Sequence, residues 1–596
     1  MNIEINGRAV ACHEGETVLA AASRAGIRIP HLCAMEHSSV PHASCRVCLV
    51  EVEGQPRLET SCTMKVREGL SVRTHSPRVL RIRRNIVELM LASHPDDCLY
   101  CERSGDCELS RLAAGMDIRG RRYGGGPKGH PVDVSSPAIV RDPNKCVLCG
   151  RCVTVCQDVQ GIGAIDYAGR GFRTLVRPGA DAGLDVSDCV FCGQCVRVCP
   201  TGALREKSAF AGLVEALADP GTRVVAQIAP AVPATLAAEL GLRGVPEALG
   251  LLSGALRRIG FDAVYDTAFT ADLTVMEEAH EFLGRLERGG PLPMFTSCCP
   301  SWVRFVELHR PRFIGNLSTC KSPQQMAATL IRKRAAQPGR RLFSVAVMPC
   351  TAKKYEAVEV GDLDAVLTTR ELGPLLEKFG LRLDADLEPA ELDEPFAEAS
   401  GGGRLFGGSG GVLESALRTA AHLKGDSSRL GPSVLTPLQG DERLRTFTVT
   451  LGGRQLRCAV VSGLGAARAL LEQVEAGTLP LDFVEVMSCP GGCIGGGGQP
   501  RSVSEGGLKA LRGKIRDAAP GRCRRLIIWS RCVQGKLGGA PDVVRGGITR
   551  DREESADDRA RQDRTVGPAH RDAPVHRAQL AGSGGAGRVG GRRGRV

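Results

Sequence analysis

The chain has 596 residues, which is too many for one hydrophobic core and predicts several domains. No apolar run approaches the roughly 18 residues that a membrane-spanning helix needs. The formal net charge is +12, but no basic patch interleaved with aromatic residues indicates nucleic-acid binding. Most of the 25 cysteines fall in closely spaced runs, which favours metal ligation over disulfide bonds and predicts a reducing, cytoplasmic location.

Residues 1–80 are expected to form a β-rich, ferredoxin-like domain. Residues 3–10 alternate like a strand, unlike a signal peptide, and residues 17–23 have a helical pattern. Four thiolates in such a domain fit a [2Fe–2S] cluster, with a structural zinc ion as the alternative. Cys12 lies outside the set and is expected to be a packed thiol. The four candidate ligands are Cys33, Cys45, Cys48 and Cys62.

Residues 81–125 contain a second cluster motif. Residues 77–91 predict an amphipathic helix with arginines on its wet face. Three cysteines follow at positions 98, 101 and 107, and they cannot complete a [4Fe–4S] cluster alone. His94 is four residues before the first and is the natural fourth ligand, beside Cys98, Cys101 and Cys107.

A Gly- and Pro-rich linker leads to an internal repeat within residues 138–208. A run of four cysteines recurs 43 residues later with the same spacing, as in bacterial two-cluster ferredoxins. In such domains the fourth cysteine of each run ligates the other cluster. One [4Fe–4S] cluster is therefore assigned to Cys146, Cys149, Cys152 and Cys199, and the other to Cys189, Cys192, Cys195 and Cys156.

From residue 209 to 505 the pattern becomes α/β, with a strand at 223–229 and helices near 246–259 and 274–288. Three further strands each end in a cysteine loop. Ligands sit at the carboxyl edge of such sheets, so the loops predict a four-thiolate set around one cubane; a flexible Gly loop with structural thiols is the alternative. The set is Cys299, Cys350, Cys489 and Cys493.

Two other segments have patterns that could indicate a function. The glycines at 463 and 465 follow a strand, but without a third glycine they favour a tight strand–helix turn over a nucleotide loop. Residues 506–596 become rich in Arg, Gly and Asp, and from 551 they lack Lys and aromatic residues. That composition predicts a disordered tail, arising from out-of-frame translation or, alternatively, binding RNA.

The three cysteine loops together resemble the signature motifs of the [FeFe]-hydrogenases. They read TSCCPSW at 296–302, MPCTAKKYE at 348–356 and EVMSCPGGCIGGGGQP at 485–500. The resemblance covers residues 1–505 and implies a multidomain α+β and α/β protein. Its parts are a β-grasp [2Fe–2S] domain, a His-ligated [4Fe–4S] domain, a two-cluster ferredoxin domain and a two-lobed α/β catalytic domain.

The resemblance also implies the cofactor. This is an H-cluster, in which a [4Fe–4S] cubane is bridged through Cys493 to a two-iron unit that carries CO, cyanide and a bridging dithiolate. Lys353 and the backbone at Ala229 and Pro230 would hydrogen-bond cyanide. The remaining wall residues implied by the family are Gln324, Met348, Met487 and Phe406.

The family's proton route implies a chain from Cys298 through Glu278 and Ser318 to Glu281. Electrons would pass along the accessory clusters to ferredoxin or to NAD(P)-linked flavin subunits, and maturases would install the two-iron unit. The reaction is reversible H2 oxidation. A non-catalytic cluster-assembly protein, an electron-wiring subunit and a hydrogen sensor are the alternatives.

Overall fold

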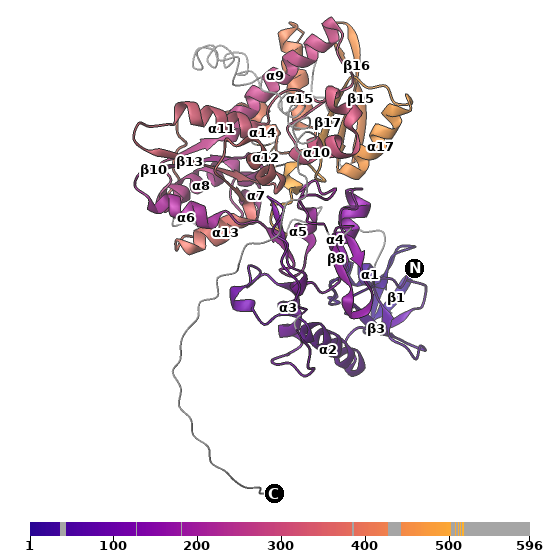
Figure 1. The fold of residues 1–596 in the computed structure, drawn as a ribbon. Helices are drawn as coiled ribbons and strands as arrows, with labels where there is room; N and C mark the ends of the chain where they lie inside the picture. The colour runs from indigo at the N-terminus through magenta and orange to yellow at the C-terminus, as the bar shows by residue number, and fades with distance from the viewer. Residues whose placement is uncertain are drawn as a thin grey trace, which may run out of the picture. The chain divides into compact units, whose positions relative to one another are not determined.

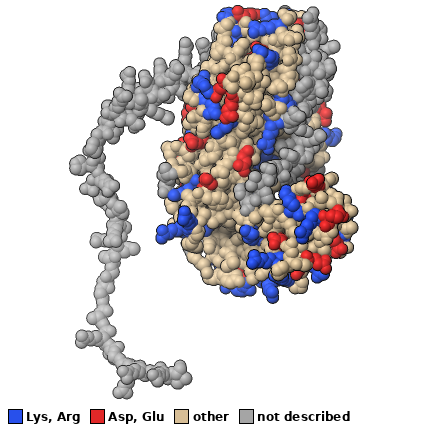
Figure 2. All heavy atoms as spheres, turned by 90° about the vertical axis from the view of Figure 1, so that its right-hand side faces the viewer, with Lys and Arg blue, Asp and Glu red and all other residues tan. Residues whose placement is uncertain are grey.

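The computed structural model describes residues 1–517 except for 36–42, 127, 180–181, 384–386, 427–442, 502–506, 508–510, 512, 514 and 516. Figure 1 follows these residues from the N-terminal sheet to the strands and helices of the α/β part. On the face in Figure 2 both signs of charge are interspersed. Every helix in the described part of the chain is too short or too polar to cross a lipid bilayer.

The first domain is a five-stranded mixed sheet with one helix. The strand order is β2-β1-β5-β3-β4, in which β1 runs parallel to β5 and antiparallel to β2. The helix begins after Thr17, whose side chain accepts a hydrogen bond from the Ala20 amide, and Cys12 packs in the core as predicted. The elements are β1 (Asn2–Ile5), β2 (Arg8–Ala11), α1 (Val18–Arg24), β3 (Leu49–Val52), β4 (Glu59–Thr60) and β5 (Ser71–Arg73).

The predicted amphipathic helix is α2 (Pro77–Ala92), capped by the Ser76 side chain, with Pro at its first position. It presents Val79 and Val87 to the interior. The second cluster motif follows as η1 (Cys98–Tyr100) and α3 (Glu108–Gly115). This motif is therefore a loop between two helices.

The internal repeat predicted from the cysteine spacing appears in the backbone. Leu148 and Phe191 both adopt positive φ, at 54° and 55°, and Gly150 and Gly193 cap the two repeat helices in the left-handed region. Each pair is separated by the same interval as the cysteine runs. The elements are β6 (Ile139–Arg141), η2 (Pro143–Lys145), α4 (Arg151–Thr154), η3 (Val155–Val159), β7 (Asp166–Ala168), η4 (Gly171–Arg173), β8 (Leu175–Arg177), α5 (Gln194–Val198) and β9 (Leu204–Glu206).

The α/β part contains two four-stranded sheets. The first has the order β11-β10-β13-β14 and is fully parallel. The second has the order β12-β17-β16-β15, with only β15 antiparallel to its neighbour. The strands are β10 (Thr222–Ile228), β11 (Ala263–Asp266), β12 (Met294–Phe295), β13 (Arg341–Met348), β14 (Ala365–Thr368), β15 (Leu444–Leu451), β16 (Arg454–Ser462) and β17 (Phe483–Met487).

Helices cover both sheets (Figure 1). The predicted helix at 274–288 begins earlier than expected, because Asp266 at the end of β11 caps it directly. The helices are α6 (Phe210–Ala218), α7 (Ala231–Glu239), α8 (Val245–Ile259), α9 (Thr267–Arg288), α10 (Pro300–His309), η6 (Pro311–Asn316), α11 (Pro323–Arg334), α12 (Ala352–Val360), α13 (Thr369–Lys378), α14 (Gly401–Leu405), α15 (Gly411–Leu423), α17 (Leu464–Glu475) and η9 (Cys493–Gly495).

The packed chain extends beyond the predicted boundary at residue 505. Leu511 and Ile515 are helical and only 2% and 3% exposed, and they pack in one cluster with Ala231 and Leu405. The helical pattern that the sequence shows at 507–515 is confirmed at these residues, since their apolar spacing of four fits one helix face. Counting them in a disordered tail from residue 506 was wrong. The rest of the predicted tail, 518–596, lies outside the described residues.

Candidate active site

The cysteine loops leave the carboxyl ends of three strands in two different sheets. Cys299 follows β12 and Cys489 follows β17, which are neighbours in the second sheet, whereas Cys350 follows β13 in the first. The strands of the two sheets end around one cavity. It contains about 740 Å³ of space outside any protein atom, a volume that includes open solvent.

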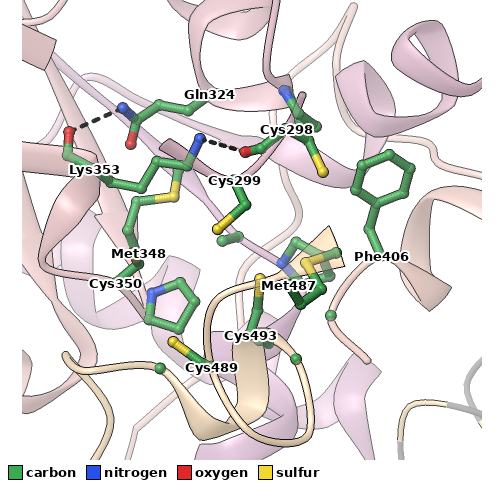
Figure 3. Close-up of a pocket in the computed structure, with 18 of the residues that line it drawn as sticks. Cys298, Cys299, Gln324, Met348, Cys350, Lys353, Phe406, Met487, Cys489 and Cys493 are labelled. Atoms are coloured by element: carbon green, nitrogen blue, oxygen red, sulfur yellow. Dashed lines mark hydrogen bonds between the residues drawn. The ribbon is translucent and has the colours of Figure 1, made fainter. Parts of the chain in front are cut away.

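The cavity wall includes every residue that the sequence assigned to the H-cluster. The thiol-bearing residues and their neighbours line it together, as Figure 3 shows. In that view Cys298 points toward Phe406, whereas the sulfur atoms of Cys299, Cys489 and Cys493 gather elsewhere in the cavity. The predicted residues in the wall are Ala229, Pro230, Cys298, Cys299, Gln324, Met348, Cys350, Lys353, Phe406, Met487, Cys489 and Cys493.

The glycines of the third loop allow a close approach of backbone to backbone. A Cβ at Gly496 would lie 2.1 Å from the Pro349 carbonyl oxygen, and one at Gly492 would lie 2.5 Å from the Ser409 amide nitrogen. Gly492 also has φ of +88°, a conformation that other residues rarely adopt. Glycine is required at these positions because the loop is folded tightly around the cavity.

A buried carboxylate, Glu485, fixes the loop at the start of α15. Glu485 on β17 is fully buried and accepts hydrogen bonds from the Gly410 amide at 2.6 Å and the Leu413 amide at 2.8 Å. These amides lie at the start of α15, where the helix dipole favours a negative charge. The interaction holds the segment that follows Phe406 against the strand that carries Cys489.

Lys353 lies at the centre of a compact polar network. Its ammonium group donates to the Cys298 carbonyl at 3.2 Å, the Ser322 hydroxyl at 2.8 Å and the Glu356 carboxylate at 2.8 Å. The same Glu356 oxygen accepts from the Gln324 amide at 3.0 Å. Burial lowers and the Glu356 carboxylate raises the pKa of Lys353, and the net shift is upward. Lys353 is therefore a fixed positive charge in the cavity wall.

Glu278 and Glu281 lie on the same face of α9 but in opposite environments. Glu278 is fully buried, and neither of its carboxylate oxygens has a hydrogen-bond partner among the described residues. Burial, together with the Glu281 charge, raises the pKa of Glu278 to about 8. Its proton can therefore leave or return near neutral pH.

Glu281 is held firmly instead. Its carboxylate accepts from Arg285 at 2.6 Å, Ser318 at 3.1 Å and the Thr319 amide at 3.0 Å. The Cys320 thiol lies 3.8 Å away. The structure thus joins Ser318 to Glu281 directly. Burial, and to a smaller extent the Glu278 charge, raise the pKa of the Cys298 thiol.

The donor set fits a cationic iron group. Burial raises the pKa of Cys350 and Cys493 to about 12 and that of Cys489 well above its usual value. Such thiols are neutral unless a cation stabilises the thiolates, and thiolate is the form that ligates iron. Soft sulfur ligands in an apolar cavity suit an iron–sulfur group.

Apart from the exposed Cys98, the relay thiols lie in buried or half-buried positions, and their assignment to clusters stays a prediction. Cys48 and Cys62 have their sulfur atoms 3.4 Å apart, and the four cysteines of the first set are at most 3% exposed. His94 is half-buried in its loop, its Nε2 has no hydrogen-bond partner among the described residues, and its Nδ1 lies 3.0 Å from the Pro95 carbonyl. That geometry leaves Nε2 available as a ligand. Cysteines of both ferredoxin runs pack in one shared cluster.

The glycine turn at 463–465 is occupied by protein backbone. The Leu464 amide donates to Gln160 at 3.1 Å, and a Cβ at Gly465 would lie 2.8 Å from the Val159 carbonyl oxygen. The expected tight turn is confirmed. Its glycines allow the two-cluster segment to pack on α17.

Several polar residues of the site were missed by sequence reasoning. Glu356 and Arg285 each pair with a predicted residue, three and four positions away on one helix. That spacing is a signal the sequence contained. Ser322 and Ser488, which lies 3.0 Å from the Cys299 sulfur, had no comparable signal.

Family models match four segments of the chain. The model described as "Iron only hydrogenase large subunit, C-terminal domain" matches residues 222–497. A 2Fe-2S iron-sulfur cluster binding domain matches 1–77, an NADH-ubiquinone oxidoreductase-G iron-sulfur binding region matches 83–122, and a 4Fe-4S dicluster domain matches 145–203. The first two cluster motifs thus match iron–sulfur families, which favours iron over zinc at Cys33–Cys62.

Two relatives align over most of the chain. The NADP-reducing hydrogenase subunit HndD of Solidesulfovibrio fructosivorans is 43% identical over 521 residues, covering 84% of this chain and 88% of that protein. Iron hydrogenase 1 of Clostridium pasteurianum is 34% identical over 529 residues, covering 86% and 92%. A third relative, cytosolic iron-sulfur assembly component 3 of Mus musculus, is 34% identical but covers only 50% of this chain and 67% of its own length.

Proposed function

The chain belongs to the iron-only hydrogenases, and on that premise we propose that it catalyses reversible H2 oxidation at an H-cluster held in the cavity. The observation that carries this proposal is the single cavity lined by five thiols, the half-buried ammonium of Lys353 and two methionines. Iron–sulfur chemistry and the hydrogenase family follow from the similarities above. The cofactor's detailed composition and the individual residue roles are our proposal.

Four thiols would hold the cubane of the H-cluster, with Cys493 bridging to the two-iron unit. Lys353 and the backbone at Ala229 and Pro230 would donate to cyanide, and Met348, Met487, Gln324 and Phe406 would enclose the diatomic ligands. When bound, the group supplies the redox-active metal position that H2 activation requires. The chain's own contribution is to orient the group and exclude water, which the apolar wall supports. The four ligands are Cys299, Cys350, Cys489 and Cys493.

Proton movement is assigned to four side chains. The Cys298 thiol would exchange a proton with Glu278, whose pKa of about 8 suits transfer near neutral pH. Ser318 donates to Glu281, which is half-buried. These two residues would carry the proton onward toward the protein surface. Adjacent residues of an extended loop point to opposite sides, which supports separate roles for Cys298 and Cys299.

Electron movement is assigned to one [2Fe–2S] and three accessory [4Fe–4S] clusters. Contacts between the relay and the cavity support a short route: the Gln194 amide donates to the Gly495 carbonyl at 2.8 Å, and the Thr351 hydroxyl donates to the Phe191 carbonyl at 2.8 Å. The proposed domains are 1–80, 81–125, 138–208 and 209–505, the last extended through Ile515. We propose NAD(P)-linked partner subunits, supported by the HndD similarity, or ferredoxin, in the cytoplasm.

A cluster-assembly role is the second candidate, because an assembly component is among the similar proteins. That similarity covers half of the chain. Two features of the cavity favour the enzyme. Cys298 and Lys353 both line it, and the fully buried Glu278 carboxylate has no hydrogen-bond partner among the described residues. An assembly protein needs cluster ligands but has no need for a buried group that titrates near neutral pH.

Infrared spectroscopy of the protein produced with hydrogenase maturases tests the proposal. CO and cyanide bands are expected together with H2 evolution and roughly 20 iron atoms per chain. Protein made without maturases should keep its iron–sulfur clusters but evolve no H2. Full H2 evolution without maturases, or matured protein lacking both bands, would refute the H-cluster.

A further inference from the structure

Arg83 is a buried arginine that has no acidic partner among the residues the structure describes. Arg83 is 1% exposed and lies on α2. It faces β3, the strand that begins directly after Cys48. Its Nε and one terminal nitrogen donate to the Leu49 carbonyl at 3.1 and 2.5 Å. The other terminal nitrogen has no hydrogen-bond partner among the described residues. Burial of an unpaired guanidinium is costly, so a compensating negative charge is expected nearby.

The first thiol set is where that negative charge would lie. Leu49 directly follows Cys48, and the Cys48 thiolate acts on Arg83 electrostatically. Burial lowers the pKa of Arg83 to about 10, so the group remains charged at neutral pH. A four-thiolate [2Fe–2S] centre is anionic, and all four cysteines are buried. The guanidinium and the cluster would therefore neutralise each other within one dry region.

Other buried cations of the relay differ from Arg83. Arg151, near Cys149, forms a bidentate pair with Glu108 at 2.8 and 3.0 Å. Lys145, near Cys101, pairs with Asp97 at 2.9 Å. Their charges are balanced by carboxylates, so they change the potential at their clusters little. The charge of Arg83 is not balanced by a carboxylate among the described residues, so it can change the potential at the nearby cluster.

We propose that Arg83 sets the reduction potential of the [2Fe–2S] cluster, raising it by favouring the state with one more electron. This inference rests on the proposed function only for the presence of that cluster at Cys33, Cys45, Cys48 and Cys62. Cluster potentials respond to net charge and to hydrogen bonds near the sulfur atoms. Arg83 is a positioning and tuning residue, since it is expected to act on the cluster without ligating it.

The test is a redox titration of the [2Fe–2S] signal by electron paramagnetic resonance in the full-length protein. Arg83→Met removes the charge and keeps the side-chain length, and Arg83→Lys keeps the charge. The matched control is Arg81→Met, because Arg81 is exposed on the same helix. At a fixed potential near the wild-type midpoint, Arg83→Met should lower the ratio of reduced to oxidised cluster by about tenfold or more. Arg83→Lys should stay near wild type and Arg81→Met should match it.

Arg83→Gln covers the case in which the methionine variant fails to assemble the cluster, because glutamine can still donate to the Leu49 carbonyl. It too should show the lower ratio. An intact signal with an unchanged midpoint in either neutral variant overturns the proposal. So does loss of the cluster in both neutral variants, which would make Arg83 an assembly residue. A wild-type protein without any [2Fe–2S] signal would instead count against the proposed cofactor.

Discussion

The two walls of the cavity treat buried charge in opposite ways. The wall formed by α11 and α12 contains Lys353, whose ammonium has three hydrogen-bond partners within 3.2 Å. On the side to which α9 contributes Thr267 and Ala271, the same helix also contains Glu278, which lies outside the cavity lining. Glu278 is more deeply buried than Lys353 and has no hydrogen-bond partner among the described residues. One wall keeps its charge permanently, and the other can gain or lose it.

This difference separates binding from proton transfer. A buried ion that is fully hydrogen-bonded stays ionised and can orient a ligand. A buried carboxyl without partners has a pKa near the working pH, which is the property of a group that passes protons. The Lys353 wall therefore suits holding a diatomic ligand, and the Glu278 wall suits moving a proton.

The largest expected effect comes from removing a thiol that is proposed to ligate the cluster in the cavity. Cys489→Ser should lose the cavity cluster and all H2 evolution, because serine is a poor iron ligand and the thiol is buried. Iron analysis and infrared spectroscopy measure the loss. Cys458→Ser is the control, since Cys458 is fully buried in a different core. A Cys489→Ser protein with normal bands and turnover would show that the cavity does not hold the cofactor.

Cys298→Ala should impair proton transfer and leave cofactor binding intact. Iron content and the infrared bands should be retained, while turnover falls at least ~10²-fold, the lower range for removing a positioned acid–base group. Cys298→Asp restores an ionisable group and should recover part of the rate. The control Cys12→Ala removes a thiol packed in the N-terminal domain. Loss of the cubane in Cys298→Ala would exchange the roles of Cys298 and Cys299.

The sequence predicted the thiols well because cysteine spacing encodes local loops. It placed the cysteine loops, the 43-residue repeat and the strands that lead to the cavity, and the five ligand sets stay predictions. It also grouped Cys350 with Cys489, although these lie at the ends of strands in different sheets. The family resemblance supplied that long-range pairing, because periodicity cannot relate two separate sheets.

The polar support of the site was harder to predict. Glu356 closes a network with Ser322 and Gln324, which lie some thirty residues away in the chain. Glu485 reaches Gly410 across 75 residues of the chain. Such partners depend on tertiary packing, so a motif alone identifies Lys353 and leaves its partners unassigned. The boundary at 505 failed for the same reason, since Leu511 is buried by α7 and α14 residues.

Glu356→Gln should weaken the Lys353 wall without removing it. The amide keeps the shape but loses the charge that fixes the ammonium, so turnover should fall about tenfold, as expected for a charge-assisted hydrogen bond of about 1.5 kcal/mol. A shift of the cyanide infrared bands would show that Lys353 moved. Glu359→Gln, an exposed position on the same helix, is the control. Unchanged bands and turnover would mean that Glu356 only supports folding.

The smallest effect is a pH-dependent change in stability, and it tests the Glu278 wall without any cofactor chemistry. The pKa of Glu278 is raised from 4.5 to about 8 in the folded protein, mainly by burial. Between about pH 5 and pH 8 the folded chain keeps a proton that the unfolded chain has released, so wild-type stability falls as the pH rises. Glu278→Gln has no such proton.

The stability of Glu278→Gln relative to wild type should therefore increase from about pH 5 to pH 8 and become constant above that range. Thermal unfolding of proteins prepared without maturases measures the difference. The pKa shift corresponds to roughly 5 kcal/mol, so the melting temperatures should differ by roughly 10 °C or more, at about 2–4 °C per kcal/mol. Glu277→Gln on the same helix should give a difference that does not change with pH. A flat difference for Glu278→Gln as well would show that Glu278 is ionised throughout, and the contrast between the two walls would fail.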